Sequence, residues 1–197
     1  KVLETRSVAI AMNYDLKSQV LSSFLNKPGT FVVSEEKMEK QKISGIAYSI
    51  NEAKITLASL PDKPGVAALI FENLANHDIN VDMIVQSASS NNTRTDITFS
   101  LPKNDLNKAI NLLKSLKEKL DFSTILHETN ISKISIIGTA MRTRPGIAKK
   151  MFSILAEKGI NLHVISTSEI KISVLIDSDY TELAVRNLHE AFGLDKN

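Results

Sequence analysis

The chain has 197 residues, of which 43% are hydrophobic and 23% are charged, and its formal net charge is +2. These values are typical of a soluble globular protein with one large or two small domains, and the small charge gives no strong attraction to nucleic acid or to an anionic membrane. The chain has no cysteine, which excludes disulfides and thiolate sites. It also has no apolar run near the roughly 18 residues that span a bilayer. We therefore expect a cytoplasmic protein without nucleic-acid or membrane partners.

The first 42 residues form an end piece whose composition differs from the rest. Apolar residues at helical spacing predict a helix over 6–15, and residues 17–24 are typical of a strand. Residues 26–42 are polar, with Pro28-Gly29 followed by a mixed-charge run, which indicates a solvated linker. Because the chain begins with Lys1 rather than Met, we expect it to be a fragment of a longer protein.

From residue 43 onward, strand and helix patterns alternate. Apolar residues on one face predict helices over 64–77, with Pro64 at the first helical position, and over 105–120, with Asp105 as N-cap. Strands are predicted over 43–51, 52–60, 79–89, 95–101 and 122–128. The order strand, helix, strand, strand, helix, strand is the ferredoxin-like pattern, a four-stranded antiparallel sheet with two helices on one face.

This unit occurs twice. Eight of the seventeen positions in 64–80 are identical in 145–161, at a constant offset of 81. The second copy has predicted strands over 131–140, 161–169 and 170–177 and helices over 145–159 and 180–192, but no fourth strand. We therefore expect strand 43–50 to pair into the second sheet. The fold class is α+β, with a first domain at 51–130 and a second at 131–197 plus 43–50.

No catalytic motif is present. The sequence has neither a phosphate-binding loop nor a dinucleotide fingerprint, so no catalytic residue, metal site or cofactor is predicted for this chain. Its four histidines lie singly and are interpreted as isolated surface residues. The run Arg142-Thr143-Arg144 is interpreted as an exposed loop, with anion binding as the alternative.

The turn at 62–65 is the best candidate for binding. A helix that starts at Pro64 or Gly65 presents unpaired N–H groups, which attract a carboxylate, and Gly65 permits close approach. Asp62 can pair with an ammonium group, and Asn80 can add a hydrogen bond, so the group matches an α-amino acid. The alternative is a simple strand–helix turn with Asp62 as a local cap. The retention of Asn80 as Asn161 in the second copy favours binding.

These residues carry a family resemblance. The segment DKPGVAALIFENLANHDINVDMI resembles an ACT domain, and INLHVISTSEIKISVLI, with QSASSNNTRTDITFSLP, resembles the paired ACT domains of aspartate kinases. Residues 1–30 similarly look like the end of that family's kinase domain, with 31–42 as the linker. The resemblance implies a regulatory region that binds lysine, threonine or both, dimerises through its ACT domains, and controls a kinase domain or catalytic subunit that uses ATP and Mg. The fragment alone is expected to be inactive.

The resemblance also implies two effector sites where ACT domains meet. The first would use Asp62, Lys63, Gly65, Val66, Ala67, Gln86 and Ser89, with Asn161 and Leu162 from the second copy. The second would use Gly146, Ile147, Ala148, Thr167, Ser168 and Glu169, with Asn80 from the first copy. Thr143 stands where Asp62 would repeat, so the second site lacks that ammonium partner unless Glu169 supplies it.

Two alternatives remain open at this point. One is an amino-acid-binding ACT module of another pathway, against which residues 1–24 argue. The other is a ferredoxin-like nucleic-acid binder, which would need more exposed aromatic residues than Tyr48 and Phe99 and a basic face.

Overall fold

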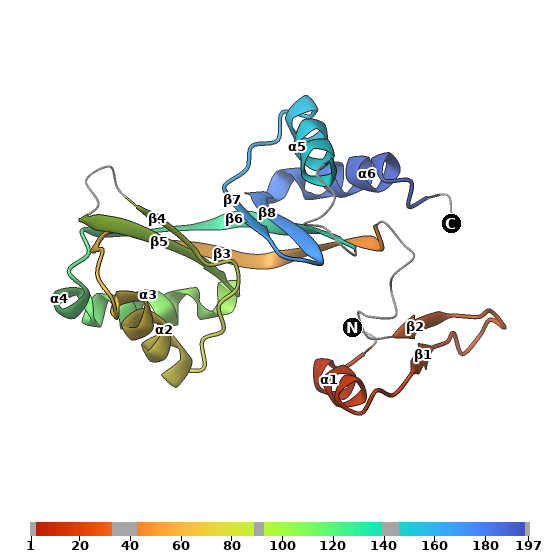
Figure 1. Cartoon of the computed structure of the whole chain (residues 1–197), viewed down its shortest axis with the longest axis horizontal. Coiled ribbons are helices and arrows are strands. Elements are labelled where there is room, and N and C mark those ends of the chain that lie inside the picture. Colours follow the sequence, from red (N-terminus) through yellow and green to blue (C-terminus); the bar gives the residue numbers. More distant parts are fainter. Residues whose placement is uncertain (1–2, 33–42, 89–92, 139–145, 196–197) are drawn as a thin grey trace. The chain divides into compact units, whose positions relative to one another are not determined.

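The structure, a computed structural model, describes residues 3–32, 43–88, 93–138 and 146–195. It forms two compact units, Lys1–Lys42 and Ile43–Asn197. The first unit holds α1 (Thr5–Asn13) and an antiparallel pair of short strands, β1 (Ser18–Val20) and β2 (Thr30–Val32) (Figure 1). Phe31 and Val32, which the sequence assigns to a linker, belong to this strand pair, and the remainder of the predicted linker, 33–42, lies outside the described residues.

The second unit is built on one six-stranded antiparallel sheet with the strand order β4-β5-β3-β6-β8-β7. Its strands are β3 (Gly45–Pro61), β4 (Val85–Ala88), β5 (Arg94–Leu101), β6 (Thr124–Ile137), β7 (Val164–Thr167) and β8 (Lys171–Asp177). Its helices are α2 (Val66–Asn76), α3 (Leu106–Ser115), α4 (Lys117–Leu120), α5 (Ile147–Glu157) and α6 (Thr181–Ala191), with short 3-10 turns η2 (Lys103–Asp105) and η4 (Ser178–Tyr180). The α+β, ferredoxin-like fold class is confirmed, and each repeat contributes one half of the sheet.

Two long strands join the halves. The start of β3 pairs with the end of β6, Gly45 lying opposite Ile137, which is the pairing that the missing fourth strand predicts. The rest of β3 pairs with β5 on one side and β6 on the other, so that Ile55 lies opposite both Phe99 and His127.

The separate strands predicted on either side of residues 51 and 129 are therefore wrong. The register of β3 against β6 shifts twice around Glu52, between Ser49 and Lys54, and both strands run through this irregularity without the break that we expected. As a consequence, the two four-stranded sheets that we expected share β3 and β6.

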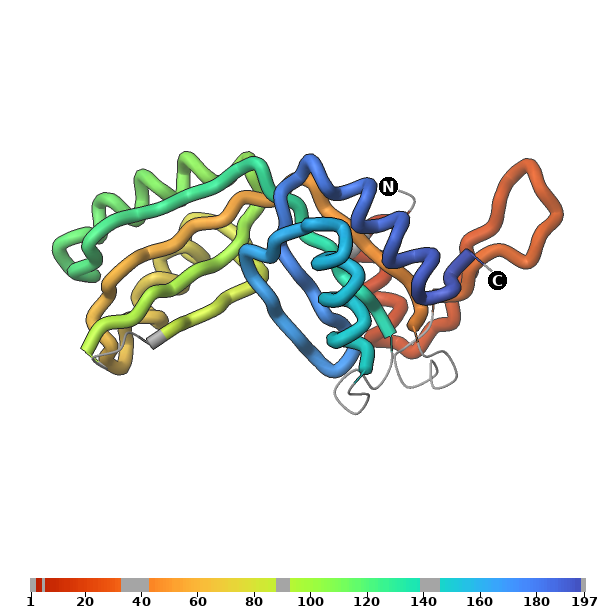
Figure 2. Tube along the Cα trace, turned by 90° about the horizontal axis from the view of Figure 1, so that it is seen from above, coloured from red at the N-terminus to blue at the C-terminus, as the bar shows by residue number. Residues whose placement is uncertain are grey.

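The helices of the two halves cover opposite faces of the sheet (Figures 1 and 2). In the first half, α2, α3 and α4 pack on Ile55, Leu57, Ile97 and Phe99. In the second half, α5 and α6 pack on the alternating residues of β8 and on β6. The alternation of Ile97, Phe99 and Leu101 that predicts a one-sided strand is confirmed, since all three are buried.

Several predicted boundaries differ from the structure. Helix α2 begins at Val66 rather than Pro64, because Gly65 takes a left-handed conformation that a helix cannot include. The helix predicted over 105–120 is interrupted at Leu116, whose ψ of 4° leaves the helical range. Asp105 stands at the N-cap position without a side-chain capping bond. The predicted strands 79–89 and 161–169 are shorter than expected, as β4 and β7. Among the described residues, no helix is both long and apolar enough to cross a membrane.

Candidate functional site

A pocket of about 380 Å³ lies at the start of α2. It is lined by Pro61, Asp62, Lys63, Pro64, Gly65, Val66, Ala67, Gln86, Thr95 and Ile97. Six residues of the first predicted effector site thus face one cavity. A larger hollow of about 780 Å³ lies between the start of β3 and α6, but it contains none of the predicted site residues, so we take the smaller pocket as the candidate site.

The backbone of the turn explains how the pocket forms. Gly65 has φ 94° and ψ −19°, a conformation that residues with a Cβ rarely adopt. Its carbonyl accepts the first hydrogen bond of α2 from the Leu69 amide, at 2.9 Å. The Asp62 amide donates to the carbonyl of Thr93 at 3.0 Å, which fixes the turn to the segment leading into β5. The Lys63 amide donates back to the Pro61 carbonyl at 3.0 Å.

The pocket is lined by positive groups, the helix end and Lys63, and by one acidic side chain, Asp62. The amides of the first helical turn, including that of Ala67, which lines the pocket, have no intrahelical acceptor and carry the partial positive charge of the helix end. Asp62 is exposed at the rim, and Gln86 of β4 lies opposite Ile97 on the neighbouring strand. Asp62 does not act as a local cap, because the N-terminus of α2 has no side-chain capping bond. The arrangement can therefore hold the carboxylate and the ammonium group of an amino acid.

None of the residues of the second copy that the structure describes lines this pocket. Asn161 is exposed, and Leu162 packs against the core of its own half. Asn80 is likewise exposed, in the loop between α2 and β4. Ser89, the last member of the first predicted site, lies outside the described residues. The binding roles of all these residues stay predictions.

The second predicted site differs from the first in its backbone. Gly146 has φ −117°, an ordinary value, and Ile147 and Ala148 are half-buried in the first turn of α5. The candidate anion-binding run, residues 142–144, lies outside the described residues. Ser168 lies in the turn between β7 and β8, where its Oγ accepts from the Lys171 amide at 3.1 Å.

Thr167 and Glu169 flank that turn residue, Thr167 as the last residue of β7. Thr95 and Ile97, which sequence reasoning missed, line the first pocket from β5. Ile97 was assigned to the core by its alternation, and its neighbour two positions back follows from the same period.

The sequence also misses a group of charges between the two halves. Lys133 contacts Glu52 at 2.9 Å and Asp82 at 2.5 Å. Burial alone would raise the pKa of Asp82, but the hydrogen bond and the charge of Lys133, the charge of Lys171 and the Met83 amide hold this pKa below its ordinary value. Burial would lower the pKa of Lys133, but its bonds to the two carboxylates and their charges keep this pKa above its ordinary value.

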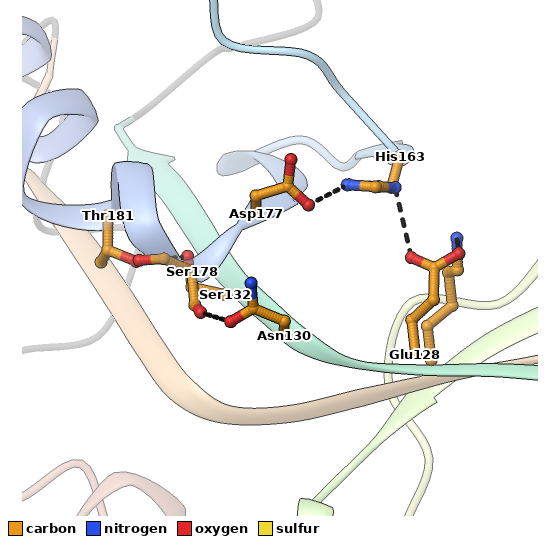
Figure 3. A network of polar contacts seen from close by, with 8 residues as sticks. Glu128, Asn130, Ser132, His163, Asp177, Ser178 and Thr181 are labelled. Atoms are coloured by element: carbon orange, nitrogen blue, oxygen red, sulfur yellow. Dashed lines mark hydrogen bonds and ion pairs between the residues drawn. The ribbon is translucent and has the colours of Figure 1, made fainter.

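His163 is not the isolated surface residue that we expected. Its side chain is only 19% exposed, and its Nε2 lies 2.9 Å from Asp177 Oδ1 (Figure 3). Its Nδ1 lies 3.3 Å from a carboxylate oxygen of Glu128. Spacing along the sequence gives no signal for these contacts, because the partners come from different strands.

Comparison with known proteins gives consistent matches. The family model described as ACT domain matches residues 55–116 and 134–192, together more than half of the chain. The aspartate kinase of Stutzerimonas stutzeri is 46% identical over 99% of this chain and 48% of its own length. The chain spans about half the length of the curated relatives it matches.

Solved structures agree with this match. The ligand-free regulatory subunit of aspartate kinase from Thermus thermophilus is 34% identical, with a TM-score of 0.72, over 77% of this chain and 99% of that subunit. The T-state structure of E. coli aspartokinase III with lysine and aspartate is 25% identical, with a TM-score of 0.72, over 98% of this chain and 42% of that protein. The chain therefore belongs to the ACT-domain family, and its two ACT domains are those of an aspartokinase regulatory region.

Proposed function

We propose that this chain is the allosteric regulatory region of an aspartate kinase and that it binds L-lysine, L-threonine or both as feedback effectors. The observation that carries the proposal is the pocket at the start of α2, where helix amides, the Asp62 carboxylate and Gln86 surround one cavity. An amino acid presents a carboxylate and an ammonium group, and this arrangement offers each group a partner.

The effector site is completed by a second copy of the chain. A helix end alone contributes about 0.3–1 kcal/mol, so useful affinity requires further contacts in a more enclosed site. Ile84, just before β4, and Ile165, in β7, are 50% and 44% exposed. The offset of 81 makes them equivalent positions of the two repeats, and β4 and β7 are the two outer strands of the sheet. These equivalent apolar edges support a homodimer in which Asn161 and Leu162 of one copy close the pocket of the other.

The second effector site follows the same logic with different chemistry. Gly146, Ile147 and Ala148 would supply the helix end, Asn80 of the other copy would close it, and Thr167, Ser168 and Glu169 would flank the ligand. Because Thr143 replaces the acidic residue of the first loop, the two sites would prefer different amino acids.

The parent enzyme would phosphorylate the β-carboxylate of L-aspartate with ATP and Mg, in the cytoplasm, through residues outside this chain. The first unit supports a place beside a kinase domain or catalytic subunit, because Tyr14 and Phe24 are 75% and 96% exposed and large apolar side chains of this kind are normally covered. The chain alone would have no kinase activity.

Effector binding would act by favouring one arrangement of the ACT domains, as the lysine-bound T-state of the E. coli relative suggests.

Isothermal titration of the chain with L-threonine and L-lysine, each alone and then in the presence of the other, tests the proposal. We expect saturable heat for at least one L-amino acid and none for its D-enantiomer. Asp62→Asn should weaken binding at the first site, with Asp105→Asn on the remote η2 turn as the matched control. Absence of heat for both amino acids, in the isolated chain and in a longer protein that carries the kinase domain, would refute the proposal.

A further inference from the structure

Residues at equivalent positions of the two repeats hold the charges between the halves of the sheet. The offset of 81 that relates the repeats connects Asp82 with His163, and it connects Glu52 with Lys133. Glu52 and Lys133 contact each other at 2.9 Å. Where a residue contacts its own equivalent in the other repeat, the local two-fold axis that relates the repeats passes between the two residues. The ion pair of Glu52 and Lys133 therefore marks the centre of the junction.

Asp82 and His163 are anchored alike. The Asp82 amide donates to the Ser100 carbonyl at 2.8 Å, and the His163 amide donates to the Leu175 carbonyl at 2.9 Å. Each residue follows by two positions an exposed asparagine that we expect to contact an effector. Their side chains therefore leave equivalent places of the two effector segments, which we define as residues 79–84 and 160–163.

Each of these side chains reaches the other repeat. Asp82 belongs to the first repeat, and its Oδ2 contacts Nζ of Lys133, in the part of β6 that pairs with β8. Lys133 also holds Glu52, whose side chain is only 8% exposed. A movement of segment 79–84 therefore acts directly on the sheet of the second repeat.

The second contact runs in the opposite direction. His163 belongs to the second repeat, and its Nδ1 approaches Glu128, in the part of β6 that pairs with Lys54 of β3 (Figure 3). Glu128 is held in place by Lys54 at 3.0 Å, and Asp177 binds the other ring nitrogen of His163. Segment 160–163 is thus tied to the sheet of the first repeat.

A small apolar cluster completes the connection. Met83 and Val164, the residues after Asp82 and His163, are both buried and share this cluster with Ile131 and Leu175. Leu175 lies on the face of β8 opposite the core residues Val174 and Ile176. The two effector segments therefore bear on the same buried side chains.

We propose that Lys133 and His163 are positioning residues that couple the two effector segments across the junction, so that an amino acid bound at one segment changes the conformation and affinity of the other. This inference rests on the proposed effector sites. Neither residue needs to touch the ligand, because each acts through the segment that it holds.

Amide spectra of the ¹⁵N-labelled chain test this coupling, since they report the segment that contacts the ligand and the remote segment in the same titration. We would titrate L-lysine and L-threonine separately into the wild type, Lys133→Met, His163→Gln and the rescue variant Lys133→Arg. Lys117→Met, which removes an exposed lysine of α4, is the matched control. Thermal unfolding of each variant identifies any that fails to fold.

In the wild type, amides of both segments should shift at ligand saturation. In Lys133→Met, or in His163→Gln if the first variant does not fold, the contacting segment should still shift with a Kd within threefold of wild type, while the shifts of the remote segment fall by at least half. Lys133→Arg and Lys117→Met should behave as wild type. Unchanged remote shifts in both variants, or no remote shift in the wild type, would overturn the coupling. A silent wild type with both amino acids would instead refute the proposed function.

Discussion

Replacement of Gly65 by aspartate should abolish amino-acid binding at the first site, because it places a carboxylate where the effector's own carboxylate is expected. The backbone there has φ 94°, which costs a residue with a Cβ roughly 1–2 kcal/mol. A Cβ built at Gly65 meets no atom within 4 Å, so this cost comes from the backbone conformation and not from a clash. The second unit should therefore remain folded.

The effect on binding is larger than the effect on stability. Loss of the helix end as an anion partner removes about 0.3–1 kcal/mol, and up to about 2 kcal/mol in a partly buried site. A second carboxylate at about 4 Å adds repulsion of up to about 4 kcal/mol at an effective dielectric constant of 20. A total loss of about 3 kcal/mol or more corresponds to a fall in affinity of more than about 100-fold.

Two further variants separate charge from backbone strain. Gly65→Ala carries the same backbone cost without the charge, and Gly146→Ala, at the equivalent position with φ −117°, carries neither. The melting temperature should fall by about 2–8 °C in both Gly65 variants and should not fall in Gly146→Ala. In isothermal titration, Gly65→Asp should bind at least tenfold more weakly than Gly65→Ala. An affinity of Gly65→Asp within threefold of wild type would refute the position of the carboxylate.

Three further predictions concern the second site, the junction and the core. Ser168→Phe should relieve feedback inhibition of the full enzyme, measured as kinase activity against effector concentration, because it fills the expected second site; full inhibition would move that site elsewhere. The stabilising effect of Lys133, measured as the difference in urea unfolding from Lys133→Met, should be constant between about pH 5 and 9. It should shrink below pH 4 as the lowered pKa of Asp82 is crossed and above pH 10.5 as the raised pKa of Lys133 is crossed, and a difference independent of pH would contradict this. The buried Oγ of Ser100 has no hydrogen-bond partner in the described part of the chain. Ser100→Ala should therefore raise the free energy of unfolding by about 1 kcal/mol and the melting temperature by about 2–4 °C. A lower melting temperature would show that the hydroxyl is paired.

The sequence predicts those parts of the fold that depend on local pattern. The apolar face of α2 and the alternation along β5 follow from periods of 3.6 and 2, and the offset of 81 predicts that the same unit forms twice. The residues around Gly65 are found for the same reason, because a helix start and its preceding turn are close in sequence. Gln86 was assigned to the same site only by the resemblance to aspartate kinases, because nothing in the local pattern joins it to the turn, and the structure places it among the residues that line the pocket.

Pairings that depend on distant residues are less accessible. Nothing in the composition of residues 49–54 distinguishes a register shift within β3 from a loop between two strands, so the continuous strands are missed. His163 was assigned to the surface because its partners Glu128 and Asp177 are 35 and 14 positions away, on strands whose register only the structure supplies. Residues that a second copy would contribute, such as Asn161, cannot be joined to their site within one chain at all.

The charges at the junction bear on why two similar repeats should not act identically. If the duplication had kept the same residue at both central positions, two like charges would face each other where Glu52 and Lys133 now form an ion pair. The opposite charges stabilise the contact between a first and a second repeat, and they would not support a contact between two identical repeats. The same asymmetry places an acid, Asp82, on one effector segment and His163 on the other. The two segments are therefore held by different groups, and an effector that displaced one of them would meet a different resistance from an effector that displaced the other.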